Sequence, residues 1–223
     1  MEAKRPLARS LAFDWVRNAI VSGVYHGHDY IEESTVCEAV GVSRTPVREA
    51  FNQLAAEKYI TLTPRHGAQV RGIGAQELLE VYEVRRLIEG RSIELLCETK
   101  ISVTDEALSA LEGRLRTTAA QHESPLDPEL RVAASQSDWM FHYSIVSAAG
   151  NSVLSETYEF LRSRQQRVSI ETGMRFPDLI RKYDEHHVAM IDAWRSFDEG
   201  EFKRILSEHL RPAERILASL DEG

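Results

Sequence analysis

Four side chains of metal-binding type are expected to point into one helical core. Asp138 and His142 lie four residues apart, so both project from the same face of a helix. His187 and His209 each lie on the apolar face of a later helical segment. Three histidines and a carboxylate are costly to bury unpaired, because each unpartnered polar group costs about 1–3 kcal/mol. The set predicts a site of nitrogen and oxygen ligands that suits Zn²⁺ first, and also Ni²⁺, Mn²⁺ or Fe²⁺.

One of these ligands has a neighbour that could replace it. His186 directly precedes His187, and the helical register decides which of the two faces the core. His187 lies four residues before the apolar Ile191 and therefore shares its face. We take His187 as the ligand and keep His186 as the alternative.

A single arginine interrupts the apolar stripe of the long helix predicted for residues 76–99. This residue is Arg85, and a buried guanidinium needs an anion as its partner. The partner could be Glu89 at the i+4 position, which would make the pair a plain salt bridge. It could instead be the carboxylate of a small ligand. A metal ion together with Arg85 suits a small organic acid as that ligand.

A second group of candidate residues lies near the N-terminus, in the pattern of two helices joined by a short turn. Gly41 can end one helix, Ser43 can cap the next, and Pro46 fits its first turn. The following apolar side chains recur at helical spacing and would face a core: Val47, Ala50, Phe51 and Leu54. The opposite face carries the side chains that would reach DNA bases in a helix-turn-helix: Ser43, Arg44, Thr45 and Arg48.

A hairpin is expected directly after this helix. Residues 59–63 and 68–71 alternate like short strands, and the turn between them contains Pro64 and Gly67. A helix-turn-helix followed by a hairpin is a winged helix. Arg65, His66 and Gly67 would form the tip of the wing.

This stretch resembles a known family. The sequence Gly-Val-Ser-Arg-Thr-Pro-Val-Arg-Glu-Ala at residues 41–50, Leu54 and the later His66-Gly67 pair are similar to the GntR family of bacterial transcription regulators. The resemblance covers about residues 8–73. It implies a dimeric regulator that binds inverted-repeat half-sites in double-stranded DNA and is controlled by a small molecule.

The rest of the chain shows helical periodicity throughout. About six helices are expected after residue 75, with Pro212 bending or breaking the last of them. This part is similar to the FCD ligand-binding domain of FadR-type GntR regulators over about residues 76–220. The resemblance maps the family's metal ligands onto Asp138, His142, His187 and His209. It favours Arg85 as a carboxylate clamp and places Asn151 near the ligand.

The charge is divided unevenly along the chain. The net charge is −8, which is unusual for a protein that binds DNA. Residues 1–75 nevertheless hold 9 basic against 8 acidic side chains, whereas the remainder holds 18 against 27. Because attraction to phosphate depends on local charge, the first part can still bind DNA, though weakly enough to need two copies.

The composition suits a soluble protein. Hydrophobic residues make up 43% and charged residues 28% of the 223 residues. No apolar run approaches the roughly 18 residues of a membrane span, and no signal-peptide pattern opens the chain. We expect a cytoplasmic protein without a membrane partner, and its two cysteines are expected to be free thiols.

The sequence therefore predicts a mainly α protein in two domains. Residues 1–74 form a winged helix-turn-helix, and residues 75–223 form an all-helical domain that binds a metal and an effector. The expected function is a homodimeric regulator, taken as a repressor, whose operator affinity a small carboxylic acid controls. One alternative is a constitutive regulator with a purely structural metal. A metalloenzyme is the less favoured alternative, because catalytic zinc sites usually keep three protein ligands instead of four, and no obvious base is nearby.

Overall fold

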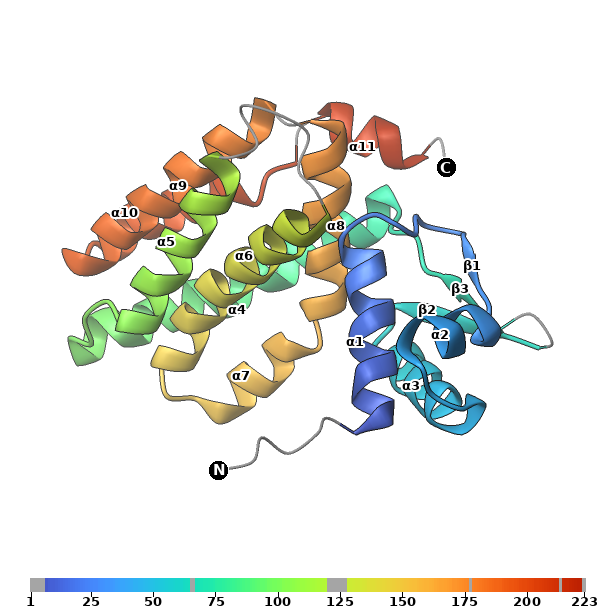
Figure 1. The fold of residues 1–223 in the computed structure, drawn as a ribbon. Helices are drawn as coiled ribbons and strands as arrows, with labels where there is room; N and C mark the ends of the chain where they lie inside the picture. The colour runs from blue at the N-terminus through green and yellow to red at the C-terminus, as the bar shows by residue number, and fades with distance from the viewer. Residues whose placement is uncertain (1–6, 65–66, 120–127, 177, 213, 222–223) are drawn as a thin grey trace. The chain divides into compact units, whose positions relative to one another are not determined.

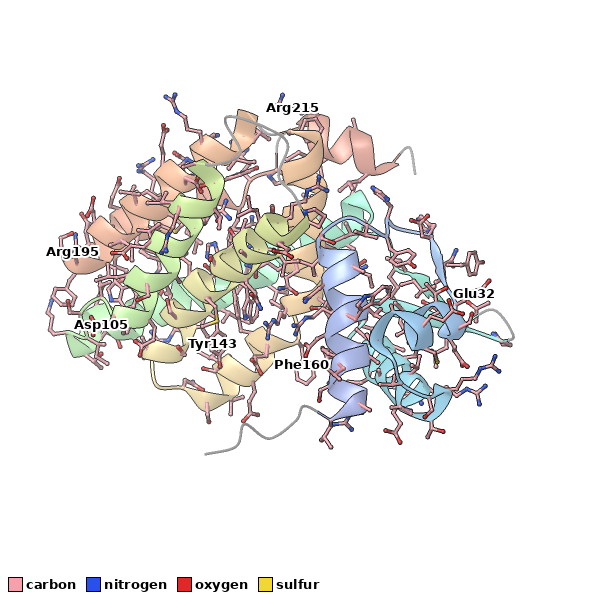
Figure 2. The ribbon with its side chains drawn as sticks, viewed as in Figure 1. Glu32, Asp105, Tyr143, Phe160, Arg195 and Arg215 are labelled. Atoms are coloured by element: carbon pink, nitrogen blue, oxygen red, sulfur yellow. The ribbon has the colours of Figure 1, made fainter. Side chains whose placement is uncertain are left out.

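The computed structural model describes residues 7–64, 67–119, 128–176, 178–212 and 214–221. The chain divides into two compact units, Met1–Gly72 and Ile73–Gly223. Figure 1 shows the helices and strands of the two units, and Figure 2 shows the same view with side chains drawn as sticks. Within the described residues, no helix has the length and apolar composition needed to cross a membrane.

The first unit is a winged helix. Its three helices are α1 (Ala8–Val21), α2 (Glu33–Val40) and α3 (Arg44–Ala56). Helix α2 ends at Gly41, whose φ of 68° lies in the left-handed region that glycine adopts without strain. The apolar face predicted for α3 is buried, with Val47, Ala50 and Leu54 fully enclosed and Phe51 nearly so. The predicted helix-turn-helix is therefore confirmed.

The wing has one strand more than expected. Strands β2 (Ile60–Thr63) and β3 (Gly67–Val70) form the predicted antiparallel hairpin. A third strand, β1 (Tyr30–Ile31), pairs with the other edge of β3 and gives the order β1-β3-β2. A strand of two residues carries no periodic pattern, so only its pairing with a distant segment reveals it.

The second unit is all helical in its described residues, and α4 lies at its centre. Helix α4 packs against α6, α7, α8, α10 and α11 (Figure 1). The eight helices are α4 (Ala75–Thr99), α5 (Asp105–Ala119), α6 (Pro128–Ala148), α7 (Ser152–Glu159), α8 (Arg162–Arg175), α9 (Asp178–Arg195), α10 (Glu199–His209) and α11 (Glu214–Asp221). Their core includes Leu78, Ile93, Phe141, Trp194 and Phe202.

The described residues of the second unit form eight helices instead of the expected six, because two segments that were each expected to form one helix form two. The segment expected as one helix from residue 151 to 170 breaks at a turn, where the Leu161 N–H donates to the Tyr158 carbonyl. This turn contains neither glycine nor proline, so the sequence does not signal it. The final segment breaks between α10 and α11 beside Pro212, since proline cannot continue the helical hydrogen bonds.

Two glycines of the first unit allow a matched test of the wing. Gly67 has a φ of +81°, and an added Cβ would lie 2.3 Å from the Ile31 carbonyl oxygen. Gly41 also has a positive φ, but nothing lies within 4 Å of an added Cβ. Gly41→Ala should therefore cost about 1–2 kcal/mol for the left-handed backbone alone. Gly67→Ala should cost about a further 1–3 kcal/mol for the overlap.

Hydrogen exchange of peptides from residues 28–72 measures this difference directly. The exchange of β1 and β3 should accelerate more in Gly67→Ala than in Gly41→Ala. Equal acceleration in the two variants would show that β1 does not lie against β3 as described.

Candidate metal centre and DNA-binding surface

Three helices bring three histidines together in the core of the second unit. His142 comes from α6, His187 from α9 and His209 from α10. The potential ligand atoms of the three side chains all lie within 4.8 Å of one another. All three are buried, and His142 and His187 are fully inaccessible to solvent. His186 is not one of the three.

The spacing of the ring nitrogens fits a shared ion. The Nε2 atoms of His142 and His187 are 3.1 Å apart. Two nitrogens that each lie about 2.1 Å from one ion are roughly 3.0–3.4 Å apart at octahedral or tetrahedral angles. Among the described residues, the Nδ1 atoms of His187 and His209 have no hydrogen-bond partner. The three residues thus fit a divalent metal in ligand type and in distance.

Burial keeps two of these histidines in the form that binds metal. It lowers the pKa of His187 well below its ordinary value, and the Arg114 guanidinium lowers it further. Burial likewise lowers the pKa of His209 well below its ordinary value, with His142 as the next contributor. Both rings are therefore neutral near pH 7, as metal coordination requires.

The fourth predicted ligand, Asp138, lies beside the histidines but has a protein partner. Its Oδ1 forms an ion pair with Arg114 Nη1 at 2.8 Å and lies 3.7 Å from His187 Nε2. Burial raises the pKa of Asp138, but Arg114 and then His142 outweigh it and leave the pKa below its usual value. The carboxylate is thus ionised. Arg114 comes from α5, and the sequence alone does not reveal this tertiary contact.

Arg85 forms the salt bridge that the sequence left open as one alternative. Its Nε donates to Glu89 Oε1 at 2.9 Å and to the Tyr158 hydroxyl at 3.2 Å. Its Nη2 is buried and has no hydrogen-bond partner in the described part of the chain. The Nε2 of Gln165, on α8, is a second buried donor of this kind. Sequence reasoning missed Gln165, because an isolated polar residue in a polar segment carries no signal.

Asn151 has a structural role instead of a place in this cluster. It is the N-cap of α7, and its side-chain oxygen accepts a hydrogen bond from the Leu154 N–H at 3.1 Å. It is also exposed, whereas the histidines and Arg85 are buried. Its predicted contact with the ligand stays a prediction.

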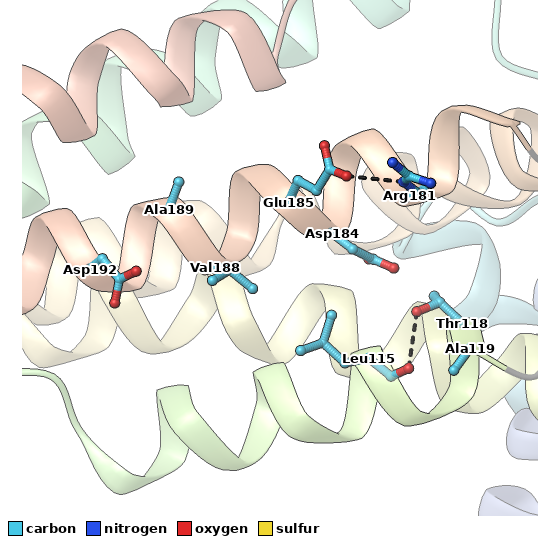
Figure 3. A pocket seen from close by; sticks show the side chains of 9 residues that line it. All are labelled: Leu115, Thr118, Ala119, Arg181, Asp184, Glu185, Val188, Ala189 and Asp192. Atoms are coloured by element: carbon cyan, nitrogen blue, oxygen red, sulfur yellow. Dashed lines mark hydrogen bonds and ion pairs between the residues drawn. The ribbon is translucent and has the colours of Figure 1, made fainter.

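A separate groove of about 470 Å³ lies between α5 and α9 (Figure 3). Leu115 and Val188 contribute apolar surface, and Asp184 lines it from α9. Asp184 also accepts a hydrogen bond from Arg114 Nε at 2.7 Å. The three clustered histidines do not line this groove. It is therefore a surface feature next to the buried cluster, not the cluster itself.

In the first unit, the predicted DNA-contacting side chains gather at the start of α3. Ser43, Arg44, Thr45 and Arg48 are all exposed there. Ser43 occupies the N-cap position, but its hydroxyl makes no capping hydrogen bond, contrary to expectation. Helix α3 therefore begins without a side-chain cap from Ser43.

Arg48 is held by a residue that the sequence did not single out. Its Nε donates to both carboxylate oxygens of Glu33, at 2.8 and 3.0 Å, so α2 fixes the direction of this arginine. The N-cap of α2 is Glu32, which is labelled in Figure 2 and accepts a hydrogen bond from the Ser34 hydroxyl at 3.0 Å. The predicted wing residues Arg65 and His66 lie outside the described residues, and Gly67 begins β3.

Comparisons with known proteins agree with both units. Residues 10–70 match bacterial regulatory proteins of the gntR family, and residues 80–212 match the FCD domain. The chain is 28% identical to the gluconate operon transcriptional repressor of Bacillus subtilis (strain 168), over 78% of this chain and 70% of that protein. It is 27% identical to the Nta operon transcriptional regulator of Aminobacter aminovorans, over 80% of each.

A solved structure shares the fold. A protein from Rhodococcus sp. RHA1 described as a GntR regulator superimposes with a TM-score of 0.77 at 21% identity, covering 95% of this chain and 98% of the other. Fold and matches together define a winged-helix regulator with a helical second domain. The chain belongs to the GntR family of bacterial regulatory proteins, with an FCD domain, and is a DNA-binding transcription regulator, not an enzyme.

The depressed histidine pKa values predict how stability depends on pH in the metal-free protein. Unfolded histidines take up protons near their ordinary pKa of 6.5, whereas the pKa values of His187 and His209 in the fold are well below this. Stability should therefore fall as the pH drops below about 6.5, by up to about 1.4 kcal/mol per pH unit for each ring.

Urea unfolding of chelator-treated protein at pH 7.5 and 5.5 measures this loss. The double variant His187→Gln, His209→Gln should show a flatter dependence over the same range. A wild-type free energy of unfolding that is equal at the two pH values would contradict the buried, neutral state of the rings.

The exposed start of α3 predicts that Arg44 contributes to sequence readout. Arg44→Ala should weaken binding to a duplex selected by the wild-type protein from a randomised pool, because a bidentate arginine contact discriminates by about 1–3 kcal/mol. Arg91→Ala, at an exposed arginine of α4, is the matched control and should bind normally. Equal affinity of Arg44→Ala and wild type in a gel-shift titration would place the reading surface elsewhere.

Proposed function

We propose that this regulator is a homodimeric repressor whose operator affinity is controlled by a small organic acid bound beside a divalent metal in the FCD domain. The single observation that carries the proposal is the buried cluster of His142, His187 and His209, whose potential ligand atoms all lie within 4.8 Å of one another. The assignment to the FadR-type subgroup also belongs to this proposal.

The metal is supported by the chemistry of the donors. Three imidazoles with a carboxylate at 3.7 Å suit Zn²⁺ first, with Ni²⁺, Mn²⁺ or Fe²⁺ as alternatives. His142, His187 and His209 would hold the ion, and Asp138 would join them if its carboxylate is shared with Arg114. When bound, the ion supplies positive charge and open positions for the oxygen atoms of an acid.

The acid is supported by two buried donors that the protein leaves unpaired. Arg85 Nη2 and Gln165 Nε2 have no partner among the described residues, and an unsatisfied buried donor is costly. A carboxylate that accepts from them would remove this cost. Glu89 engages only the Nε of Arg85 and leaves its Nη2 without a partner in the described residues.

The remaining parts of the proposal rest on the relatives and on charge. The gluconate operon relative is a repressor by name, and gluconate is itself an organic acid. The first unit carries little net positive charge, so two copies on inverted-repeat half-sites would supply the affinity that one lacks. The expected cytoplasmic location stays a prediction.

An acid effector should stabilise the zinc-loaded full chain in a thermal-shift screen of mono- and dicarboxylic acids and sugar acids. A ligand at about 100 times its Kd adds about 2.7 kcal/mol. Arg85→Lys should abolish the shift, because lysine keeps the charge beside Glu89 but lacks the guanidinium fork. Arg91→Lys, on the exposed face of the same helix, should keep it.

The same acid should weaken operator binding by about 5–150-fold, the usual range of coupling between two sites. A full shift in Arg85→Lys would exclude the guanidinium as the clamp. No shift with any acid would favour the alternative of a constitutive regulator in which the metal is purely structural.

A further inference from the structure

One buried carboxylate joins Arg85 to the histidine cluster. Glu89, on α4, is fully inaccessible to solvent. Its Oε1 accepts hydrogen bonds from Arg85 Nε at 2.9 Å and from the Tyr158 hydroxyl at 2.7 Å. Its Oε2 accepts from His142 Nδ1 at 2.8 Å. Three side chains from α4, α6 and α7 therefore converge on one carboxylate.

These contacts keep Glu89 negative despite its burial. Its Oε1 forms a buried ion pair with the Arg85 guanidinium at 2.9 Å, and the Tyr158 hydroxyl donates to the same oxygen. A carboxylate that is ionised at neutral pH can only accept hydrogen bonds. The Nδ1 of His142 must therefore carry the proton and donate it to Glu89.

This hydrogen bond fixes the tautomer of His142. With the proton on Nδ1, the lone pair of Nε2 points away from Glu89, and Nε2 lies 3.1 Å from His187 Nε2. The other two histidines lack such support in the described residues, since their Nδ1 atoms have no hydrogen-bond partner. The nearest carboxylate oxygen to His187 Nδ1, on Asp184, is 4.0 Å away and is held by Arg114.

We propose that Glu89 is the positioning residue of the metal centre, whose carboxylate holds the His142 ring in the tautomer and orientation that bind metal. Arg85 and Tyr158 hold that carboxylate in place from the other side. The inference rests on the metal site in the proposed function and adds a residue that does not touch the ion. A carboxylate behind a ligating histidine raises the basicity of the ligand, so its loss weakens metal binding by about 10–100-fold.

The test is a zinc-affinity titration of the full chain against a chromophoric chelator, with Zn²⁺ as the only added ligand. Glu89→Gln removes the charge but keeps the shape, and it should bind Zn²⁺ about 10–100-fold more weakly than wild type. Glu94→Gln is the matched control, because Glu94 lies on the same helix but pairs with Arg91 and Lys203. It should bind Zn²⁺ as the wild type does.

A spectroscopic readout separates positioning from a structural role. The visible absorption of bound Co²⁺ reports the ligand field, and it should change in Glu89→Gln but not in Glu94→Gln. If Glu89→Gln fails to fold, the double variant Arg85→Met, Glu89→Gln removes both charges of the buried pair and restores the balance. This variant should fold and still bind Zn²⁺ about 10–100-fold more weakly.

The outcomes distinguish this inference from the proposed function. A wild-type chain that binds no Zn²⁺ or Co²⁺ would overturn the metal site, and the role of Glu89 with it. A wild-type chain that binds both, alongside a folded Glu89→Gln or double variant of unchanged affinity and spectrum, would overturn the role of Glu89 alone.

Discussion

The burial of the Glu89 carboxylate constrains much of the helical unit. A charge without solvent contact is tolerated only when ionic and hydrogen-bonding partners surround it. Arg85, Tyr158 and His142 provide these partners from α4, α7 and α6. The turn between α7 and α8 fits this arrangement, because it follows Tyr158 directly and closes on its carbonyl group. Removing any one partner would leave a buried charge or donor uncompensated.

The same desolvation produces the chemistry of the site. Burial favours neutral His187 and His209, and neutral imidazole is the form that binds a divalent ion. Burial also makes the unpaired donor of Arg85 an attractive place for an anion, since hydrogen bonds are electrostatically stronger at the low dielectric of a protein interior. A metal and an acid bound there would change contacts on several helices at once. This is the kind of local change that a regulator can transmit to its DNA-binding unit.

Local patterns allowed the sequence to predict much of this molecule, whereas tertiary contacts remained hidden. The helix-turn-helix was visible because Gly41, Pro46 and the spacing of Val47, Ala50 and Phe51 each act within a few residues. The convergence of the three histidines followed from helical faces. The pairing of Asp138 with Arg114, the strand β1 and the donor of Gln165 depend on segments that are distant in sequence. The N-cap role of Asn151 is local, since its side-chain oxygen accepts from the Leu154 N–H three residues on.

The measurement that tests the central claim most directly is X-ray absorption spectroscopy of the full chain loaded with zinc. Three imidazoles on one ion should give a first shell of nitrogen and oxygen at about 2.0–2.1 Å, with the outer-shell scattering of histidine rings. The signal should fit three histidines per zinc. A first shell with sulfur at about 2.3 Å, or one without histidine scattering, would contradict the account, because it would place the metal away from His142, His187 and His209.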